Sequence, residues 1–166
     1  MEASLAGTSA AVITVSDRCA SGEREDRTGP VIARTLTNAG AQVTHATIPD
    51  GADSVESAVR GALAAGARLV LTTGGTGVSP RDFTPEATAR VVTQLLPGIT
   101  EALRRADADA VPAAMLSRGL AGIVGHEHRA VVINLPGSVA AVSSGMRVLM
   151  TVLPHLMSQL DGGDHP

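Results

Sequence analysis

The feature that most constrains the fold is a repeated alternation of short apolar segments with amphipathic ones. Residues 10–16 and 69–73 are apolar and rich in β-branched side chains, and residues 42–48 alternate as a strand does. Segments with the three-to-four-residue spacing of a helix follow each of them. Strands that alternate with helices predict an α/β fold, with a mostly parallel sheet sandwiched by helices on both faces.

The expected helices have recognisable ends. Thr28 and Pro30 mark the start of a helix that stops at Gly40, and a second helix covers residues 53–65. Further helices are expected over residues 84–96 (Thr84 as cap, Pro97 and Gly98 as stop), 99–106 and 139–160 (kinked at Pro154). Residues 119–124 and 129–135 are expected to form two strands of a β-hairpin.

Length and composition indicate one small domain. The 166 residues fit one domain over residues 10–160, with a flexible N-terminus over 1–9 and a flexible tail over 161–166. The single cysteine, Cys19, excludes an intrachain disulfide and fits a reducing compartment. No apolar run approaches the roughly 18 residues that cross a bilayer, so we expect a cytoplasmic protein without a membrane partner. A net charge of -3 without a basic stripe argues against nucleic acid.

A glycine-rich loop over residues 74–81 carries the strongest functional signal. Three of its first four residues are glycines, which let backbone N–H groups turn inward around an anion. The helix start at Thr84 adds free N–H groups, and Arg81 supplies a charge for phosphate. Asp82 beside such a site needs compensation, which a magnesium ion would give. The alternative is a plain turn in which Asp82 only caps a helix. The loop fits neither a Walker motif nor a dinucleotide motif.

Two other polar pairs follow predicted parallel strands. Ser16 and Asp17 end the first strand, and Pro49 and Asp50 end the second. Ligands of parallel α/β sheets bind beyond the carboxyl ends of the strands, so these residues and the glycine loop are expected to share one rim. Asp50 and Asp82 would then hold one metal ion. Taken alone, the first pair also fits a helix cap, and Asp50 also fits a common Pro-Asp-Gly turn.

Five ordered motifs together carry a resemblance. They are residues 14–17 with 21–22, residues 48–50, the glycine loop with residues 81–88, residues 115–118 with 121–122, and residues 133–138. This set, spanning roughly residues 12 to 155, resembles the molybdopterin-binding family that includes molybdopterin adenylyltransferase and gephyrin-type G domains. The resemblance implies a parallel-sheet domain with a small β-hairpin subdomain, assembled as a homotrimer.

The resemblance also implies a reaction. AMP passes from MgATP to the terminal phosphate of molybdopterin, which yields adenylylated molybdopterin and pyrophosphate, and hand-over to a molybdenum-inserting protein would follow. By motif position, Asp50 and Asp82 match the essential acids that hold Mg²⁺. The substrate-binding residues expected on this reading are Ser16, Asp17, Gly74, Gly75, Thr76, Gly77, Ser79, Arg81, Thr84, Ser117, Arg118, Pro136, Gly137 and Ser138. Phe83 departs from the family pattern, in which a smaller aliphatic residue is more usual.

Other functions stay open on the sequence alone. The alternatives are a non-catalytic molybdopterin carrier of the same family, a scaffold protein, and an unrelated nucleotide-binding protein. His126, Glu127 and His128 carry side chains that can bind a metal ion. A hairpin turn with exposed polar side chains explains them more simply. Intact Asp50 and Asp82 favour the enzyme.

Overall fold

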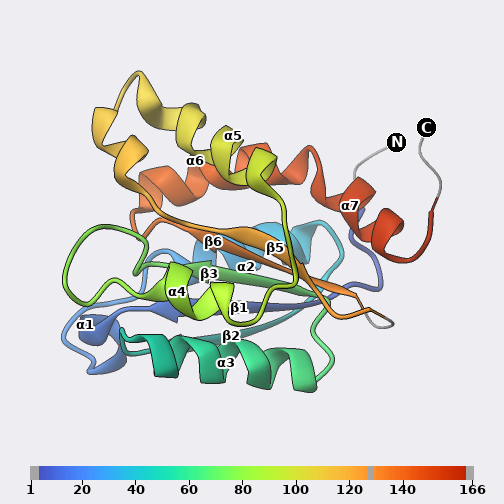
Figure 1. Cartoon of the computed structure of the whole chain (residues 1–166), viewed down its shortest axis with the longest axis horizontal. Coiled ribbons are helices and arrows are strands. Elements are labelled where there is room, and N and C mark those ends of the chain that lie inside the picture. Colours follow the sequence, from blue (N-terminus) through green and yellow to red (C-terminus); the bar gives the residue numbers. More distant parts are fainter. Residues whose placement is uncertain (1–3, 127–128, 164–166) are drawn as a thin grey trace.

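The computed structural model describes residues 4–126 and 129–163, so Glu127 and His128 lie outside the described residues. In this part of the chain six strands form a sheet in the order β2-β1-β3-β6-β5-β4, with helices on both sides (Figure 1). The strands are β1 (Ser9–Val15), β2 (Gln42–Ile48), β3 (Leu69–Thr73), β4 (Gln94–Leu95), β5 (Ala121–Val124) and β6 (Ala130–Leu135). Strands β1, β2, β3 and β6 run parallel to one another. Strand β5 pairs antiparallel with both β6 and β4. The predicted α/β fold is confirmed, and the expected hairpin is β5–β6, which continues the same sheet.

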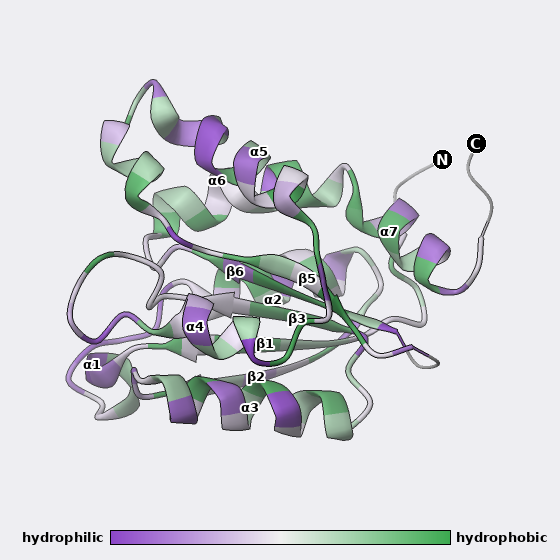
Figure 2. Cartoon of the chain, viewed as in Figure 1, coloured by the Kyte–Doolittle hydropathy of each residue, from purple (hydrophilic) through white to green (hydrophobic). Residues whose placement is uncertain are grey.

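Alternate residues of the central strands point to opposite faces of the sheet. The helices are α1 (Asp17–Ala20), α2 (Gly29–Asn38), α3 (Ala52–Ala64), α4 (Thr84–Ala89), α5 (Pro97–Ala108), α6 (Val139–Met150) and α7 (Leu153–Leu160), with a 3-10 turn at Pro112–Leu116. Val12 and Ile133 pack toward α2, α6 and α7, whereas Ile13 and Val132 pack toward α3 and α4. Figure 2 shows the strands mainly in hydrophobic colours, with hydrophilic residues on the outer turns of α3 and α5. Burial on both faces explains the continuous apolar strands.

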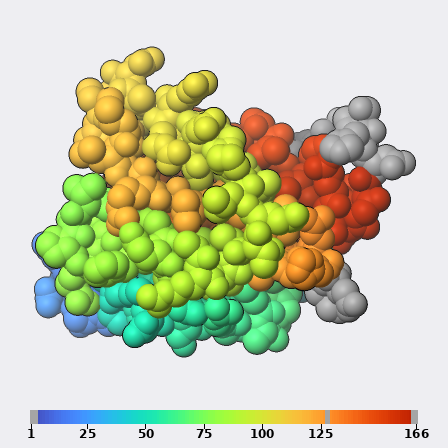
Figure 3. Space-filling view, in the orientation of Figure 1, coloured from blue at the N-terminus to red at the C-terminus, as the bar shows by residue number. Residues whose placement is uncertain are grey.

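The helix predicted over residues 84–96 is wrong beyond Ala89. The chain turns there, and Gln94 and Leu95 pair with β5 as an added edge strand. The backbone N–H of Thr93 donates to Ile123 O at 2.8 Å. Pairing with the free edge of β5 outweighs local helix propensity in a run of β-branched residues, which form helices poorly. In Figure 3 residues of this segment, in yellow-green, cover the near side of the molecule.

Other predicted ends also shift. Pro97, expected to stop a helix, begins α5, since proline fits the first turn of a helix. The loop expected after Ser16 contains the short helix α1, whose first turn is capped by the Ser16 hydroxyl accepting from Cys19 N at 3.3 Å. The expected long C-terminal helix breaks before Pro154 into α6 and α7, which are bent by 54°.

Residues near both ends of the described chain contact the rest of the domain. Leu5 is 1% exposed in the core and its N–H donates to Ala39 O at 2.7 Å, inside the segment expected to be flexible. Arg68 pairs with Asp161 at 2.8 Å. No single described helix has the length and apolar composition to cross a bilayer; α6 and α7 meet that test only when joined across their bend.

Candidate functional site

The carboxyl ends of the four parallel strands meet at one edge of the sheet, at the left of Figure 1. β1 leads into Ser16 and Asp17, β2 into Pro49 and Asp50, β3 into the glycine loop, and β6 into residues 136–138. Each loop leaves a strand that is hydrogen-bonded to its neighbours in the sheet. The sheet therefore brings together segments that are widely separated in the sequence, as the strand pattern predicts.

Asp17 and Asp50 are joined directly. Asp17 N donates to Asp50 Oδ2 at 2.9 Å, and Asp50 N donates to Asp17 Oδ1 at 3.1 Å. Arg81 then grips Asp17 through Nε at 2.6 Å and Nη2 at 3.1 Å, and it also donates to Asp50 O at 3.1 Å. The hydrogen bond from Arg81 lowers the pKa of Asp17, and Asp17 raises the pKa of Arg81. Arg81, predicted to face phosphate, thus has a protein partner at the rim.

The glycine loop begins in a backbone conformation that suits glycine. Gly74 has φ +100° and Gly75 has φ +66°. A Cβ on Gly74 would lie 2.2 Å from Val15 O, and one on Gly75 would lie 2.3 Å from Thr84 Oγ1. Thr84 closes the loop, because its hydroxyl donates to Gly74 O at 2.9 Å and its N–H donates to Gly75 O at 3.1 Å. The helix cap position belongs to Phe83, so the expected cap role of Thr84 is wrong.

The carboxylates of Asp50 and Asp82 lie near two positions of the glycine loop, Gly75 and Gly77. An ideal Cβ at Gly75 would lie 3.4 Å from Asp50 Oδ1, and one at Gly77 would lie 2.9 Å from Asp82 Oδ2. Asp82 Oδ2 also accepts the N–H of Ser79 at 3.0 Å. In residues 4–126 and 129–163, no group of three or more acidic, histidine or cysteine side chains forms a metal cage. Two carboxylates beside one glycine loop fit Mg²⁺, which typically takes one or two carboxylates, substrate oxygens and water.

Arg118 holds the glycine loop through hydrogen bonds to its backbone carbonyl groups. Its Nε donates to Gly77 O at 2.8 Å and its Nη2 donates to Asp82 O at 2.7 Å, while the guanidinium pairs with Glu86. The hydrogen bond from Arg118 lowers the pKa of Glu86. Arg118, predicted as a ligand residue, is therefore held by the backbone carbonyls of the loop and by Glu86.

Several other predicted ligand residues also contact neighbouring protein groups. Ser117 Oγ donates to Thr76 Oγ1 at 3.4 Å. Pro136 O accepts the hydroxyl of Thr73 at 2.8 Å, and Ser138 Oγ caps α6 by accepting the N–H of Ala141 at 3.2 Å. The Thr73–Pro136 contact fixes the segments after β3 and β6 relative to each other, and the Ser117–Thr76 contact joins the loop before β5 to the glycine loop. The rim is therefore preorganised by its own hydrogen bonds.

A cavity of about 510 Å³ opens at the rim, and we call it the glycine-loop cavity. Ser16, Asp50, Gly74, Gly75 and Gly137 are the predicted site residues that line it. Arg24 and Arg27 also line it, although neither was predicted as a site residue from the sequence. Their signal was weak, because they lie in a charged loop whose place beside Gly74 depends on the fold.

A second open cavity of about 490 Å³ lies on the other side of Asp50, and we call it the Phe83 cavity. Its wall includes Asp50, Arg81, Phe83, Glu86 and Arg90. Asp50 borders both cavities, whereas Asp82 is outside the lining of each. Both volumes are within the range of small-molecule sites.

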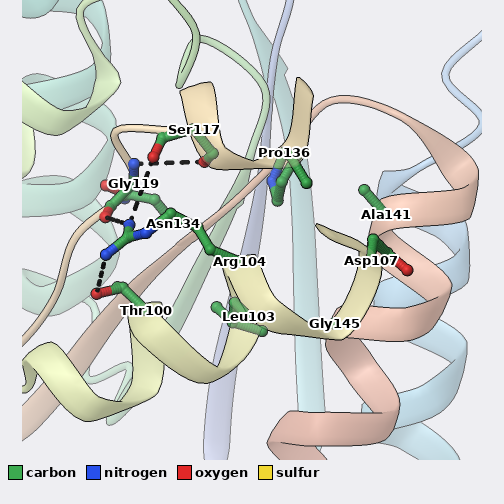
Figure 4. Close-up of a pocket in the computed structure, with 11 residues that line it drawn as sticks. Thr100, Leu103, Arg104, Asp107, Ser117, Gly119, Asn134, Pro136, Ala141 and Gly145 are labelled. Atoms are coloured by element: carbon green, nitrogen blue, oxygen red, sulfur yellow. Dashed lines mark hydrogen bonds between the residues drawn. The ribbon is translucent and has the colours of Figure 1, made fainter. Parts of the chain in front are cut away.

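A third, smaller cavity lies between α5, α6 and the ends of the loops that carry Ser117 and Pro136 (Figure 4). The Arg104 guanidinium spans its wall, with weak contacts to Thr100 Oγ1 at 3.4 Å and to Ser117 O at 3.4 Å. Its volume of about 30 Å³ holds about one water molecule. A pterin ring is far larger than this cavity, whereas each of the two cavities that Asp50 borders is large enough for one.

A partly buried hydrogen-bond cluster anchors the loop that carries Arg24 and Arg27. Asp26 Oδ1 accepts the N–H groups of Thr28 and Gly29, each at 3.0 Å. Asp26 Oδ2 lies 3.0 Å from His45 Nε2. Burial raises the pKa of Asp26, but hydrogen bonds from Thr14, Gly29 and Thr28 outweigh it and hold that pKa below its usual range. A Cβ on Gly29 would lie 2.1 Å from His45 Nε2, so a larger residue there would displace the side chains of this cluster.

The fold and the rim define a class: a parallel α/β domain with a glycine loop and two carboxylates at the carboxyl ends of its strands. Residues 11–155 match a family model described as a probable molybdopterin binding domain. The chain belongs to this family, which serves molybdenum cofactor biosynthesis.

Similar proteins agree. The chain is 45% identical over 162 residues to a molybdenum cofactor biosynthesis bifunctional protein from Synechococcus elongatus, covering 97% of the chain and 50% of that protein. It is 40% identical to a molybdopterin adenylyltransferase from Pyrococcus furiosus, covering 88% of the chain and 87% of that protein. The Mog protein structure from Mycobacterium ulcerans superposes with a TM-score of 0.87 at 39% identity, over 93% of this chain and 99% of that one. The chain thus spans about half of its bifunctional relative.

Proposed function

We propose that the chain transfers AMP from ATP to the terminal phosphate of molybdopterin and releases pyrophosphate. The observation that carries this proposal is that Asp50 borders two ligand-sized cavities, one on each side. A reaction between two bound substrates needs such a meeting point. The molybdopterin adenylyltransferase from Pyrococcus furiosus, which aligns over most of both chains, supports the same reaction.

In this mechanism an oxygen of the molybdopterin phosphate forms a bond to the α-phosphorus of ATP. The bond from that phosphorus to the bridging oxygen breaks, and pyrophosphate leaves with the electron pair. A phosphate monoester dianion is already nucleophilic, so the protein contributes position and charge stabilisation. No side chain is needed as a strong base.

The rim residues supply that position and charge. The Gly74 N–H already donates to Leu135 O at 3.0 Å, so the N–H of Gly75 binds the phosphate oxygens. Arg24 and Arg27 add positive charge to a wall that also carries Glu25 and Asp26. Asp50 and Asp82 hold Mg²⁺, which offsets negative charge on the phosphates when bound. Asp17 and Arg81 fix the position of Asp50.

The test is pyrophosphate release by the purified chain with molybdopterin, ATP and Mg²⁺, compared with mixtures lacking one component. Release that needs all three components supports adenylyl transfer. Tight molybdopterin binding without pyrophosphate would instead favour the carrier function. The homotrimer and the hand-over to a molybdenum-inserting protein stay predictions that sedimentation and transfer assays can check.

A further inference from the structure

The glycine loop is held by Arg118 at three of its backbone carbonyl groups. The N–H of Arg118 donates to Thr76 O at 2.8 Å. Its side chain donates to Gly77 O at 2.8 Å and to Asp82 O at 2.7 Å. These acceptors stand at both ends of the loop segment that leads to Asp82. The position of the Asp82 carboxylate therefore depends on the position of Arg118.

Arg118 itself lies in a segment without regular secondary structure. Residues 117–120 connect the 3-10 turn to β5. Arg104 of α5 contacts the carbonyl groups on both sides of Arg118, because its Nη1 donates to Ser117 O at 3.4 Å and to Gly119 O at 3.5 Å. Figure 4 shows the guanidinium reaching from α5 toward these two residues. Both bonds are long, so each is weak, but one charged group makes them together.

The charge of Arg104 has no carboxylate partner among the residues that the structure describes. Asp107 lines the same cavity, but it accepts the hydroxyl of Ser144. The remaining contact of the guanidinium is to Thr100 Oγ1 at 3.4 Å. A half-buried charge is costly unless polar groups compensate it. The carbonyl groups that flank Arg118 give much of that compensation here.

We infer that Arg104 is a positioning residue for Asp82. It fixes the carbonyl groups on both sides of Arg118, and Arg118 fixes the loop segment that leads to Asp82. This inference rests on the proposed function, in which Asp82 holds Mg²⁺ together with Asp50. Asp50 is held by a different set of contacts, which includes Asp17. A change at Arg104 should therefore displace one of the two acids and leave the other in place.

Two backbone N–H groups report on the two acids separately. Ser79 N donates to Asp82 Oδ2 at 3.0 Å, and Asp17 N donates to Asp50 Oδ2 at 2.9 Å. Both amide signals can be followed by nuclear magnetic resonance in the protein without ligand or metal. The first signal measures the placement of Asp82, and the second measures the placement of Asp50.

The test variant is Arg104→Gln, which removes the charge that the two carbonyl groups share. We expect the amide signal of Ser79 to move and its hydrogen exchange to become about fivefold faster, because its acceptor is displaced. The amide signal of Asp17 should stay unchanged. Arg104→Lys keeps a charged donor without the planar fork of arginine, so it should give a smaller change. Arg105→Gln removes the same charge from an exposed position of α5 and should change neither signal.

The same variants are then compared in pyrophosphate release against Mg²⁺ concentration. A displaced Asp82 weakens metal binding, so the Mg²⁺ concentration for half-maximal rate should rise about fivefold in Arg104→Gln. The value of kcat at saturating Mg²⁺ should change less than twofold. Arg105→Gln should match the wild type in both quantities.

Any of four results would overturn the inference. They are an unchanged Ser79 amide in Arg104→Gln, equal changes in the Ser79 and Asp17 amides, the same changes in Arg105→Gln, and an unaltered Mg²⁺ requirement in active Arg104→Gln. Thermal unfolding identifies a misfolded variant, in which case Arg104→Lys against Arg105→Lys decides. Absence of pyrophosphate release by the wild type refutes only the reaction, and the two amide signals then decide the role of Arg104 by themselves.

Discussion

Asp17 and Asp50 exchange hydrogen bonds in both directions, each accepting the backbone N–H of the other at 3.1 and 2.9 Å. The pair joins the ends of β1 and β2. Arg81 ties the glycine loop to the same pair, since it contacts Asp17 and the carbonyl of Asp50. The position of Asp50 between the two cavities thus depends on a carboxylate that lines neither.

Asp17→Ala should lower pyrophosphate release about tenfold, because the Asp50 N–H loses its carboxylate acceptor and Arg81 loses its ion pair. Arg81 lowers the pKa of Asp17, so the charge of Asp17 is present above the ordinary carboxyl value of about 4 and is lost only as pH falls through a still lower pKa. Rates of variant and wild type should therefore keep a constant ratio from pH 5 to 8. A ratio that changes within this window contradicts the assignment.

Asp82→Asn should reduce kcat by about 10²-fold or more, provided that the carboxylate stabilises charge in the transition state by a few kcal/mol. Asparagine keeps an oxygen that can accept the N–H of Ser79, so the loop should persist. The measurement is pyrophosphate release against Mg²⁺ concentration. Unchanged turnover with unchanged magnesium dependence refutes the role of Asp82.

Gly75→Ala should destabilise the fold by about 2–4 kcal/mol, for two reasons. Alanine would have to adopt the left-handed backbone conformation of Gly75, and its Cβ would lie 2.3 Å from Thr84 Oγ1. Gly61→Ala is the control, since its helical site in α3 has nothing within 4 Å. That variant should gain roughly 0.5–1 kcal/mol. Urea unfolding compares the two variants with the wild type. Equal stability of the two variants would show that the loop conformation is not as described.

Asp26→Asn should cost about 1 kcal/mol of stability at pH 7, because it weakens the hydrogen bonds from Thr28 and Gly29 and changes the contact between Asp26 Oδ2 and His45 Nε2. The pKa of Asp26 is below its usual range, so this stabilisation is full above the ordinary carboxyl value and disappears as pH falls through the folded pKa. Urea unfolding at pH 7 and pH 3 should show the difference between variant and wild type shrinking at the lower pH. A difference that grows toward pH 3 has the wrong sign.

Local signals specify most of the strands and the location of the site. Apolar β-branched runs fix β1, β3 and β6 because strands buried on both faces need continuous apolar side chains. The parallel order then places the loops after them at one edge, which is why Asp50 and the glycine loop were predictable neighbours. The adjacent glycines at 74 and 75 are also a local signal for an unusual loop conformation, and both have positive φ angles that favour glycine.

By itself, the sequence determined the alternation of strands and helices, the glycine loop and the two acids of the rim. Only the tertiary structure decided that α4 ends at Ala89, that Arg81 and Arg118 hold protein groups, and that Arg24, Arg27 and Phe83 line cavities. The physical reason is range. Apolar periodicity and glycine conformation act within a few residues, whereas ion pairs, edge-strand pairing and cavities form between segments that meet only after the chain has folded.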